Sequence, residues 1–377
     1  MPALLRALNE RTVLNAVRAS GPLSRADLAR QTGISRPTVS LVLRALLEDG
    51  LVRETELEPG RPHYGAVYYE ADPEAAVVLG VDFGSRAVRA ALCDLSGEVR
   101  AREEIRSRGS VEERIDALAS TCSSLLRRSK LPGDLLENAV VALPAVVSPV
   151  DGSVSSADLP GLGSADLREQ LEQALHVGVT LENDVNLAAL GEQRHGVAQG
   201  VGDFAFLLVG AGLGAAIVIG GTLHRGRNGA AGEIDAVRNG RLDDVDPCAA
   251  AVSKYAAELA AEKETVLEPP FEARELLAAA RKGDGVAVAV LEEAARRIAL
   301  HVLPLAATLD LPLVVLGGSL GGNTELLEPV RRHLQEWVPF APRVEVSALG
   351  EAAVLEGALA DGVDTALERV FMRRARA

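Results

Sequence analysis

The residues best suited to chemistry in this 377-residue chain are an amide and a carboxylate, Asn183 and Asp184, in the run LENDVN at positions 181–186. They stand where an apolar, strand-like segment passes into a helical one, which is a usual place for a site in an α/β fold. A carboxylate at such a junction can take a proton from a hydroxyl group or accept hydrogen bonds from one. The plain alternative is that Asn183 caps the helix and Asp184 interacts favourably with its dipole.

A second carboxylate, Glu233, lies in the glycine-containing run AAGEI at positions 230–234. Between the two acidic motifs, a glycine loop at 210–214 joins two apolar, strand-like segments. A dinucleotide-binding fingerprint needs a helix after its glycines, and here a β-branched run follows, so we expect a hairpin and reject Rossmann-type binding. A later glycine loop, 317–322, follows another apolar strand and is suited to a phosphate or an adenosine, although each glycine loop taken singly could be a plain turn.

The first 70 residues predict a different kind of structure. Ser24 and Asp27 form a capping-box pattern before a short helix, and Gly33 lies in the tight turn that follows. Pro37 falls in the first turn of the next helix, which is expected to end at Gly50. Helix, glycine turn and helix is the spacing of a helix-turn-helix, and the strand-like runs after it predict a β-wing.

Donors suited to base edges and phosphates lie on the exposed N-terminal face of the third helix: Ser35, Arg36, Thr38, Ser40 and Arg44. Arg61, between a glycine and a proline at the predicted wing tip, is the candidate for the adjacent minor groove. The alternative is a small helical bundle without a ligand, in which Arg61 is a solvated turn residue. We expect this region to bind double-stranded DNA.

Charge and composition limit the remaining possibilities. The net charge is −14, but residues 1–70 carry nine arginines against eight acidic residues, about +1, which leaves about −15 for the rest. A near-neutral head permits DNA binding, whereas an acidic body disfavours non-specific binding to polyanions. No apolar run approaches the roughly 18–20 residues that cross a bilayer, so no membrane partner is expected. The three scattered cysteines, Cys93, Cys122 and Cys248, fit a reducing cytoplasm.

Taken together, the motifs resemble those of the ROK family of repressors and sugar kinases. Their order is a helix-turn-helix, VDFGS at 81–85, LENDVN, GAGLGAAIVIGG at 210–221, AAGEI and LGGSLGG at 316–322. The resemblance implies an α/β protein with an N-terminal winged helix-turn-helix, residues 1–70, a linker, 71–76, and a two-lobed actin-like (ribonuclease H-like) body, 77–377. It also implies a homodimer or a higher homo-oligomer.

Three departures from the family pattern bear on function. Arg86 replaces the threonine that follows the first phosphate loop in the kinases, and Ala236 replaces the histidine that touches the sugar and a structural zinc. The cysteine run that binds this zinc is replaced by residues 241–248, in which Cys248 is the single cysteine. Because tetrahedral zinc needs four ligands, we expect no metal and no cofactor.

Two functions from different classes follow from the resemblance. The first is a DNA-binding transcriptional regulator, expected to be a repressor, that responds to a sugar held in the interlobe cleft by Asn183, Asp184 and Glu233. Its body could alternatively serve only to dimerise the heads. The second is an ATP-dependent sugar kinase with Asp184 as general base. Arg86, the loss of the histidine at position 236 and the complete head favour the regulator, which is expected not to be an enzyme.

Overall fold

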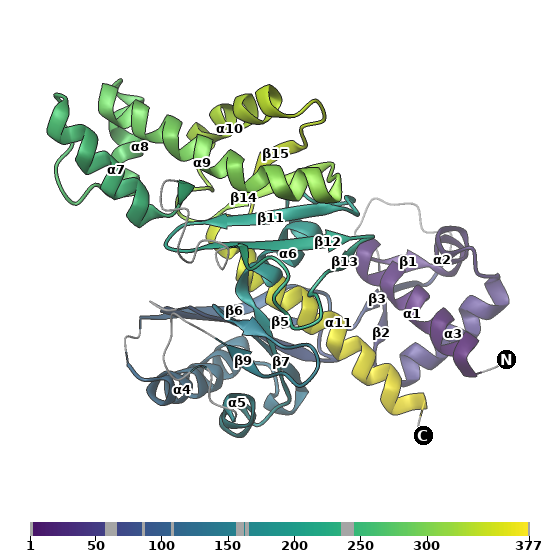
Figure 1. Ribbon diagram of the computed structural model, residues 1–377. Coiled ribbons are helices and arrows are strands. Elements are labelled where there is room, and N and C mark those ends of the chain that lie inside the picture. The colour runs from purple at the N-terminus through teal and green to yellow at the C-terminus, as the bar shows by residue number, and fades with distance from the viewer. Residues whose placement is uncertain are drawn as a thin grey trace.

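The computed structural model describes residues 3–56, 66–84, 87–106, 109–155, 162, 166–234 and 245–375. Within these ranges the chain forms a small N-terminal head and a body of two lobes (Figure 1). No helix in these ranges combines the length and the apolar character that a bilayer crossing requires. The positions outside them include several named above: Arg61, Arg86, Ala236, and residues 241–244 of the run that replaces the cysteines.

Three helices and a three-stranded sheet build the head: Ala3–Ser20 (α1), Leu23–Ser24 (β1), Arg25–Thr32 (α2), Arg36–Glu48 (α3), Val52–Thr55 (β2) and Tyr68–Ala71 (β3). The predicted capping box is confirmed, since the Ser24 hydroxyl accepts from the Asp27 N–H and the Asp27 carboxylate accepts from the Ser24 N–H. The head is therefore a winged helix-turn-helix. Its α3 ends at Glu48, two residues before the predicted end, and β3 extends to Ala71.

Lobe 1 is built on a five-stranded sheet in the order β10-β7-β4-β5-β6. The antiparallel strands β4–β6 come first in the chain, and β7 and β10 then run parallel to β4. Two helices cover one face of this sheet with apolar side chains. The elements are Val77–Phe83 (β4), Ala87–Asp94 (β5), Val99–Arg106 (β6), Val111–Ser129 (α4), Leu136–Leu143 (β7), Val146–Val147 (β8), Val154–Ser155 (β9), Leu167–Leu175 (α5) and Val179–Asn183 (β10).

Lobe 2 repeats this arrangement in the order β13-β12-β11-β14-β15, with three antiparallel strands followed by two parallel ones. The glycine loop at 210–214 joins β11 and β12 as the predicted hairpin. The elements are Phe204–Val209 (β11), Leu213–Ile219 (β12), Thr222–Leu223 (β13), Ala249–Glu262 (α7), Ala273–Arg281 (α8), Gly285–Leu309 (α9), Leu313–Gly317 (β14), Thr324–Trp337 (α10) and Arg343–Val346 (β15). Two sheets of one topology confirm the predicted actin-like body.

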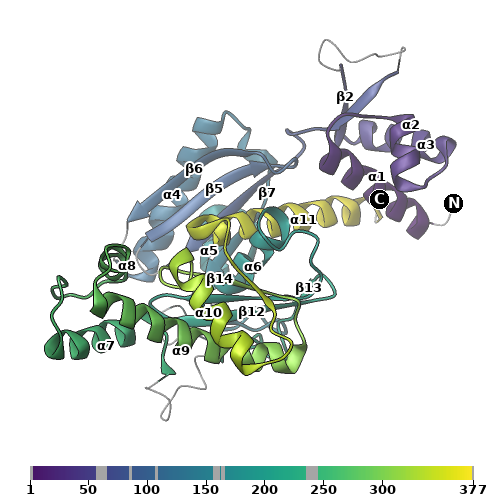
Figure 2. The same ribbon diagram turned by 90° about the horizontal axis from the view of Figure 1, so that it is seen from above.

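Two helices, Asp184–His195 (α6) and Ala353–Ala375 (α11), lie between the lobes (Figure 2). Val185 and Ala189 of α6 pack on the sheet of lobe 2, whereas Leu187 packs with Ala142 of lobe 1 and Ala358 of α11. The two helices cross at glycines. A Cβ at Gly191 would overlap the Ala353 carbonyl oxygen, and one at Gly357 would overlap that of Leu187. The backbones are therefore in direct contact.

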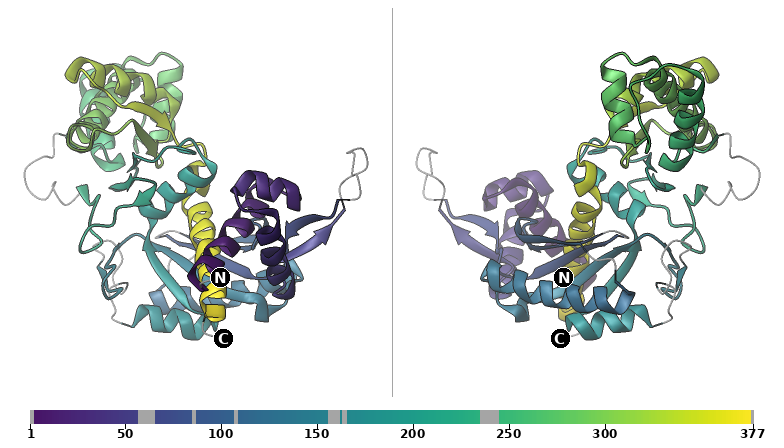
Figure 3. Two further views of the ribbon diagram at one scale, coloured as in Figure 1. Left: turned by 90° about the vertical axis from the view of Figure 1, so that its right-hand side faces the viewer. Right: turned by 90° about the vertical axis from the view of Figure 1, so that its left-hand side faces the viewer.

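The far half of α11 leaves the lobes and lies beside α1 of the head (Figure 3). Val13, Leu14 and Val17 of α1 share one buried apolar cluster with Val363 and Leu367 of α11. The same cluster includes residues of β4 and β5. The head is thus packed on the body, and α11 is the element that contacts both lobes and the head.

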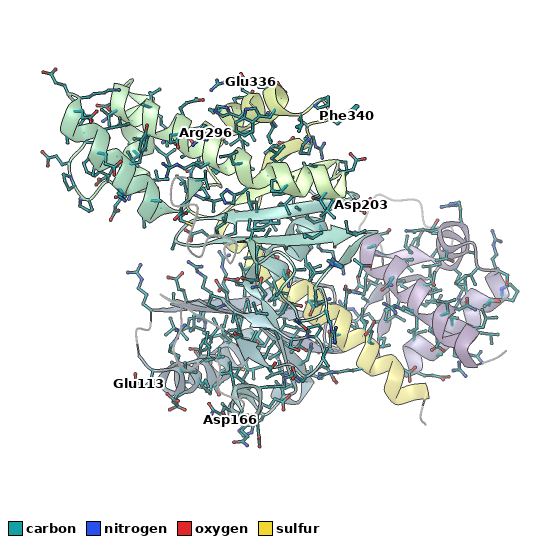
Figure 4. The ribbon with its side chains drawn as sticks, viewed as in Figure 1. Glu113, Asp166, Asp203, Arg296, Glu336 and Phe340 are labelled. Carbon is teal, nitrogen blue, oxygen red and sulfur yellow. The ribbon has the colours of Figure 1, made fainter. Side chains whose placement is uncertain are left out.

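Acidic side chains lie on the outer faces of both lobes. Figure 4 shows Glu113 at the start of α4 and Asp166 just before α5, and both are exposed. Glu336 on α10 is exposed on lobe 2. These positions agree with the excess negative charge of the body and leave the head as the part of the chain whose charge permits DNA binding.

The helix crossing gives a first prediction. Gly357→Ala should destabilise the protein by about 2–4 kcal/mol, because the new methyl group has to displace the Leu187 carbonyl of α6. Gly285→Ala in the first turn of α9 is the matched control, since its Cβ would meet no atom within 4 Å. Urea unfolding of the two variants measures the difference. Equal stabilities would contradict the backbone contact.

Candidate functional site

The helix-turn-helix places α3 with one apolar and one exposed face. Gly33 has a φ of +72°, which favours glycine, and its N–H donates to the Ala29 carbonyl at 3.1 Å, so the chain turns sharply after α2. Val39 and Leu43 of α3 are buried in the core of the head. The opposite face of α3 is therefore open to a ligand.

Five of the six predicted DNA-binding residues lie at the start of α3 or along the helix. Ser35, Arg36, Ser40 and Arg44 are exposed and Thr38 is half-buried. Ser35 occupies the position before the helix, but its hydroxyl lies 2.9 Å from the Thr38 hydroxyl and makes no bond to the helix backbone. The sixth residue, Arg61, lies outside the described ranges.

Sequence reasoning missed Leu41, whose side chain is 62% exposed on the same part of α3. Its position four residues after Pro37 and three before Arg44 was the available signal, since residues at this spacing share a helix face. An exposed apolar group among arginines and hydroxyls suits contact with a thymine methyl group. The exposed face thus offers both polar and apolar contacts to base edges.

In the body, Asn183 performs the capping role that the sequence left open. Its Oδ1 accepts from the Asn186 N–H at 3.0 Å, and its Nδ2 donates to the Ala145 carbonyl at 3.1 Å. The residue is 8% exposed. Asn183 therefore holds the start of α6 against lobe 1.

Asp184 is the first residue of α6, and its Oδ1 accepts from the Val185 N–H at 2.8 Å. Burial raises the pKa of this carboxyl to about 7, and the negative charges of Asp82 and Glu233 add to the shift. Asp184 thus lies near carboxylates from β4 and from the AAGEI loop. The two predicted acidic residues, Asp184 and Glu233, are thus close enough for the charge of Glu233 to act on Asp184.

The AAGEI loop is fixed to both lobes by close backbone approaches. The Ala215 N–H of lobe 2 donates to the Gly232 carbonyl at 2.9 Å, and a Cβ at Gly232 would overlap the Ala215 carbonyl oxygen. A Cβ at Gly229 would overlap the carbonyl oxygen of Val147 in lobe 1. Both glycines have positive φ angles, 90° at Gly232 and 79° at Gly229. The position of Glu233 therefore depends on how the lobes are arranged.

Glu182 and Arg225 were not predicted as site residues. The Arg225 Nε lies 2.5 Å from the Glu182 Oε2, so this ion pair joins the loop after β13 in lobe 2 to β10 in lobe 1. The other oxygen of Glu182 accepts from the Asn183 N–H and the Asn186 side chain, each at 2.9 Å. A pocket of about 440 Å³ beside the pair is lined in part by Ser148, Arg168 and Thr180. Glu182 belongs to LENDVN, a motif that the sequence already indicates. Its partner, Arg225, lies 43 residues further along the chain, and the sequence does not connect the two.

Comparison with known proteins separates the head from the body. The ROK family pattern matches residues 78–363 and the MarR family pattern matches residues 7–61. The xylose repressor of Caldicellulosiruptor bescii is 25% identical and covers 95% of this chain and 96% of its own length. The DNA-binding transcriptional dual regulator NagC of Escherichia coli is also 25% identical, with 96% and 95% covered. The chain belongs to the ROK family.

Solved structures of the ROK family agree with this division. A ROK family transcriptional regulator, a homologue of the E. coli MLC protein, superposes with a TM-score of 0.79 at 20% identity and covers 98% of both chains. A ROK family glucokinase from Streptomyces griseus, in complex with glucose and AMPPNP, gives 0.66 at 25% identity. It covers 77% of this chain and 100% of its own. The fold of the whole chain, head included, is that of the ROK regulator.

The carboxylate at the end of β4 is paired with an arginine, which distinguishes this segment from a simple phosphate-binding loop. Asp82 is 8% exposed and pairs across the β4–β5 hairpin with Arg89, whose guanidinium lies 3.2 Å from the carboxylate. Burial raises the pKa of Asp82, and the charge of Arg89 opposes the shift. Arg89 also contacts Glu104 of β6 at 3.0 Å and Glu351 before α11 at 3.2 Å. This ROK chain therefore carries an internal cation on the carboxylate of its first loop.

Residues 241–248 stand in place of the zinc-binding cysteine run of the family, and the structure describes them from Val245 onward. There the Asp246 carboxylate accepts from the Cys248 N–H at 2.8 Å, and Cys248 itself is buried at the start of α7. Among the described residues no three His, Cys, Asp or Glu side chains form a group that could hold a metal ion. The absence of zinc stays a prediction, because positions 235–244 lie outside this description.

The raised pKa of Asp184 gives a second prediction. Ionising this carboxyl is less favourable in the folded protein, so its cost develops between the ordinary pKa of 3.8 and about 7 and is complete above pH 7. Asp184→Asn should therefore raise the melting temperature at pH 8, with the gain disappearing towards pH 4. Asp116→Asn, at an exposed position of α4, is the control that should show no such pH dependence. A gain that is the same at every pH would contradict the shift.

Proposed function

We propose that this DNA-binding transcriptional regulator of the ROK family is a repressor that responds to a sugar bound between its lobes. The observation that carries the proposal is the exposed N-terminal face of α3, in a head that is packed on a complete ROK body. The relatives that match nearly the whole chain are named as regulators, whereas the glucokinase matches the body alone. The DNA contact is then made by Ser35, Arg36, Thr38, Ser40 and Arg44, with Arg61 in the wing.

The body acts as a sensor and has no kinase activity. A base at Asp184 does not decide the question, because a carboxyl with a pKa of about 7 suits proton transfer as well as hydrogen bonding. The ion pair of Asp82 with Arg89 supports the sensor, since the arginine occupies a carboxylate of the first loop for which a nucleotide-bound metal ion would have to compete. A coupled assay with ATP and a sugar panel should detect no phosphorylation.

The sugar is bound by the carboxylates of Asp184 and Glu233 and by the amide of Asn183. Two carboxylates and an amide can chelate adjacent hydroxyl groups, and a buried acceptor discriminates against ligands that lack a matching donor. The sugars in the names of two relatives, a xylose repressor and an N-acetylglucosamine repressor, define the chemical class to be tested. The protein acts in the cytoplasm as a homodimer or a higher homo-oligomer, because helix-turn-helix dimers read two half-sites spaced by whole turns of DNA.

Operator binding should depend on the arginines of α3. An operator is first selected from genomic fragments with the purified protein, and binding is then measured by gel shift or anisotropy. Arg36→Ala or Arg44→Ala should cost about 1–3 kcal/mol for a base contact, with altered sequence preference, or weaken binding evenly and flatten the salt dependence for a phosphate contact. Thermal stability should change little, because both side chains are exposed.

Arg127→Ala, at an exposed position of α4 in lobe 1, is the matched control and should bind like the wild type. Wild-type affinity in the Arg36 or Arg44 variant would remove that residue from the interface. Loss of affinity in the Arg127 variant would show that the body also contacts DNA.

Sugar binding should depend on Glu233. Calorimetry against glucose, xylose, N-acetylglucosamine and N-acetylmannosamine should find a ligand whose heat of binding is lost in Glu233→Gln, while operator binding without sugar stays intact. Because a ligand shifts operator affinity only through its different affinities for the two states, the expected change is about 5–150-fold. If no sugar gives heat and none shifts the gel, the body serves only to dimerise the heads.

A further inference from the structure

A carboxylate on α11 lies between an arginine of the head and an arginine of the body. The Arg194 Nη2, at the end of α6, lies 2.8 and 2.7 Å from the two oxygens of Asp364. The Arg18 Nη1, near the end of α1, lies 3.9 Å from the same carboxylate. We refer to Arg18, Asp364 and Arg194 as the junction. The junction joins α1 of the head, the C-terminal helix α11 and the helix α6 between the lobes.

The arginine on the head side of the junction is the least exposed of the three. Its side chain is 14% exposed, against 53% for Asp364 and 47% for Arg194. The Arg18 Nε donates to the Leu95 carbonyl at 2.9 Å, in the connection between β5 and β6, and burial lowers the pKa of the guanidinium. A buried cation that loses its carboxylate keeps its desolvation cost. The position of α1 therefore depends on Asp364 more than exposed ion pairs usually allow.

Ion pairs carry this part of the interface because packing is incomplete there. A cavity of about 530 Å³ is lined by α1, the β5–β6 connection, the end of α6 and α11. Arg18, Arg194 and Asp364 all line it, together with Asn15 and His195. The apolar contact between α1 and α11 lies to one side, around Val13, Val17 and Val363. On the cavity side the charged groups of the junction link the elements across open space.

Both ends of α6 are then occupied by functional groups. Asp184 stands at its first residue, where the charges of Asp82 and Glu233 act on it, and Arg194 stands in its last turn at the junction. A charge from the loop after β13 also acts on α11, one turn before Asp364. Burial raises the pKa of Asp361 to about 6, and the charge of Arg225, the partner of Glu182, opposes that shift. The helices α6 and α11 thus connect the region of Asp184 and Arg225 with the junction, where they meet at the carboxylate of Asp364.

We propose that Asp364 is a positioning residue for DNA binding: by holding Arg18 of the head and Arg194 of α6 together, it sets where the head lies on the body and carries the state of the cleft to the operator. The proposal rests on the proposed function for its DNA and sugar readouts. It requires no contact of Asp364 with DNA or with the sugar. A head released from the junction has to be ordered when it binds DNA, so operator affinity falls when the carboxylate is removed.

The test compares Asp364→Asn with Glu368→Gln. Glu368 also lies on α11 and pairs with the head, through Arg11 at 3.5 Å, but both of these side chains are more than half exposed and the pair does not include α6. Asp364→Asn should weaken operator binding about 5-fold or more, reduce the shift caused by any sugar found active on the wild type, and speed amide hydrogen exchange in the second half of α1 and at residues 94–97. Glu368→Gln should match the wild type in all three measurements.

Two further variants separate positioning from a general loss of stability. Asp364→Glu keeps the carboxylate and should restore operator affinity, whereas Arg194→Gln should reproduce the effect of Asp364→Asn without altering the head. Melting temperatures should stay close to that of the wild type in all four variants. Wild-type exchange in α1 and wild-type operator affinity in Asp364→Asn would overturn the proposal. If the wild type binds no specific DNA, the proposed function fails, and the exchange of α1 still tests the junction.

Discussion

The direct backbone contact between α6 and α11 is the constraint on which the rest of the body depends. Gly191 and Gly357 bring the two helices so close that neither position has room for a methyl group. The same α11 meets the sheet of lobe 1 at Gly362, where a Cβ would overlap the Val78 side chain. Because packed elements of this density have few alternative arrangements, any change in the relation of the lobes would have to move these helices as units. A displacement at the cleft end of α6 is then also a displacement at its other end, beside the head.

The distribution of buried charge agrees with the proposed ligand, which carries hydroxyl groups. Asp82 and Glu182 are buried, and each has an arginine partner that offsets the cost of leaving water. Asp184 has no ion-pair partner among the described residues, and its pKa is raised accordingly. A hydroxyl that donates to this carboxylate would replace part of the lost hydration, whereas a phosphate would add to the negative charge already supplied by Asp82 and Glu233. The electrostatics thus favour a neutral polyol at the Asp184 end of the cleft.

The parts of the structure that could be predicted from the sequence are those set by local spacing. The capping box at Ser24, the glycine turn at Gly33 and the hairpin around the glycine loop at 210–214 each depend on neighbouring residues. The site residues that could not be predicted depend on contacts between distant segments. Arg225 reaches Glu182 across 43 residues, and Arg18 meets Asp364 only because α11 returns past both lobes to the head. Arg89 lies between these two cases. The register of the β4–β5 hairpin places it opposite Asp82, but this register follows from the length of the intervening loop, which the sequence pattern alone did not give.

The energies involved fit a regulator better than a rigid scaffold. A partly exposed ion pair such as that of Arg194 with Asp364 contributes only about 0.2–1 kcal/mol, because solvent screens it. Allosteric coupling between two sites is typically about 1–3 kcal/mol. In the proposed homodimer two heads would engage two junctions, so small differences at each would add to the scale at which a ligand changes occupancy of the DNA. A much stronger link would hold the heads in one position with or without a ligand, and a much weaker one would leave the position of the heads independent of ligand binding.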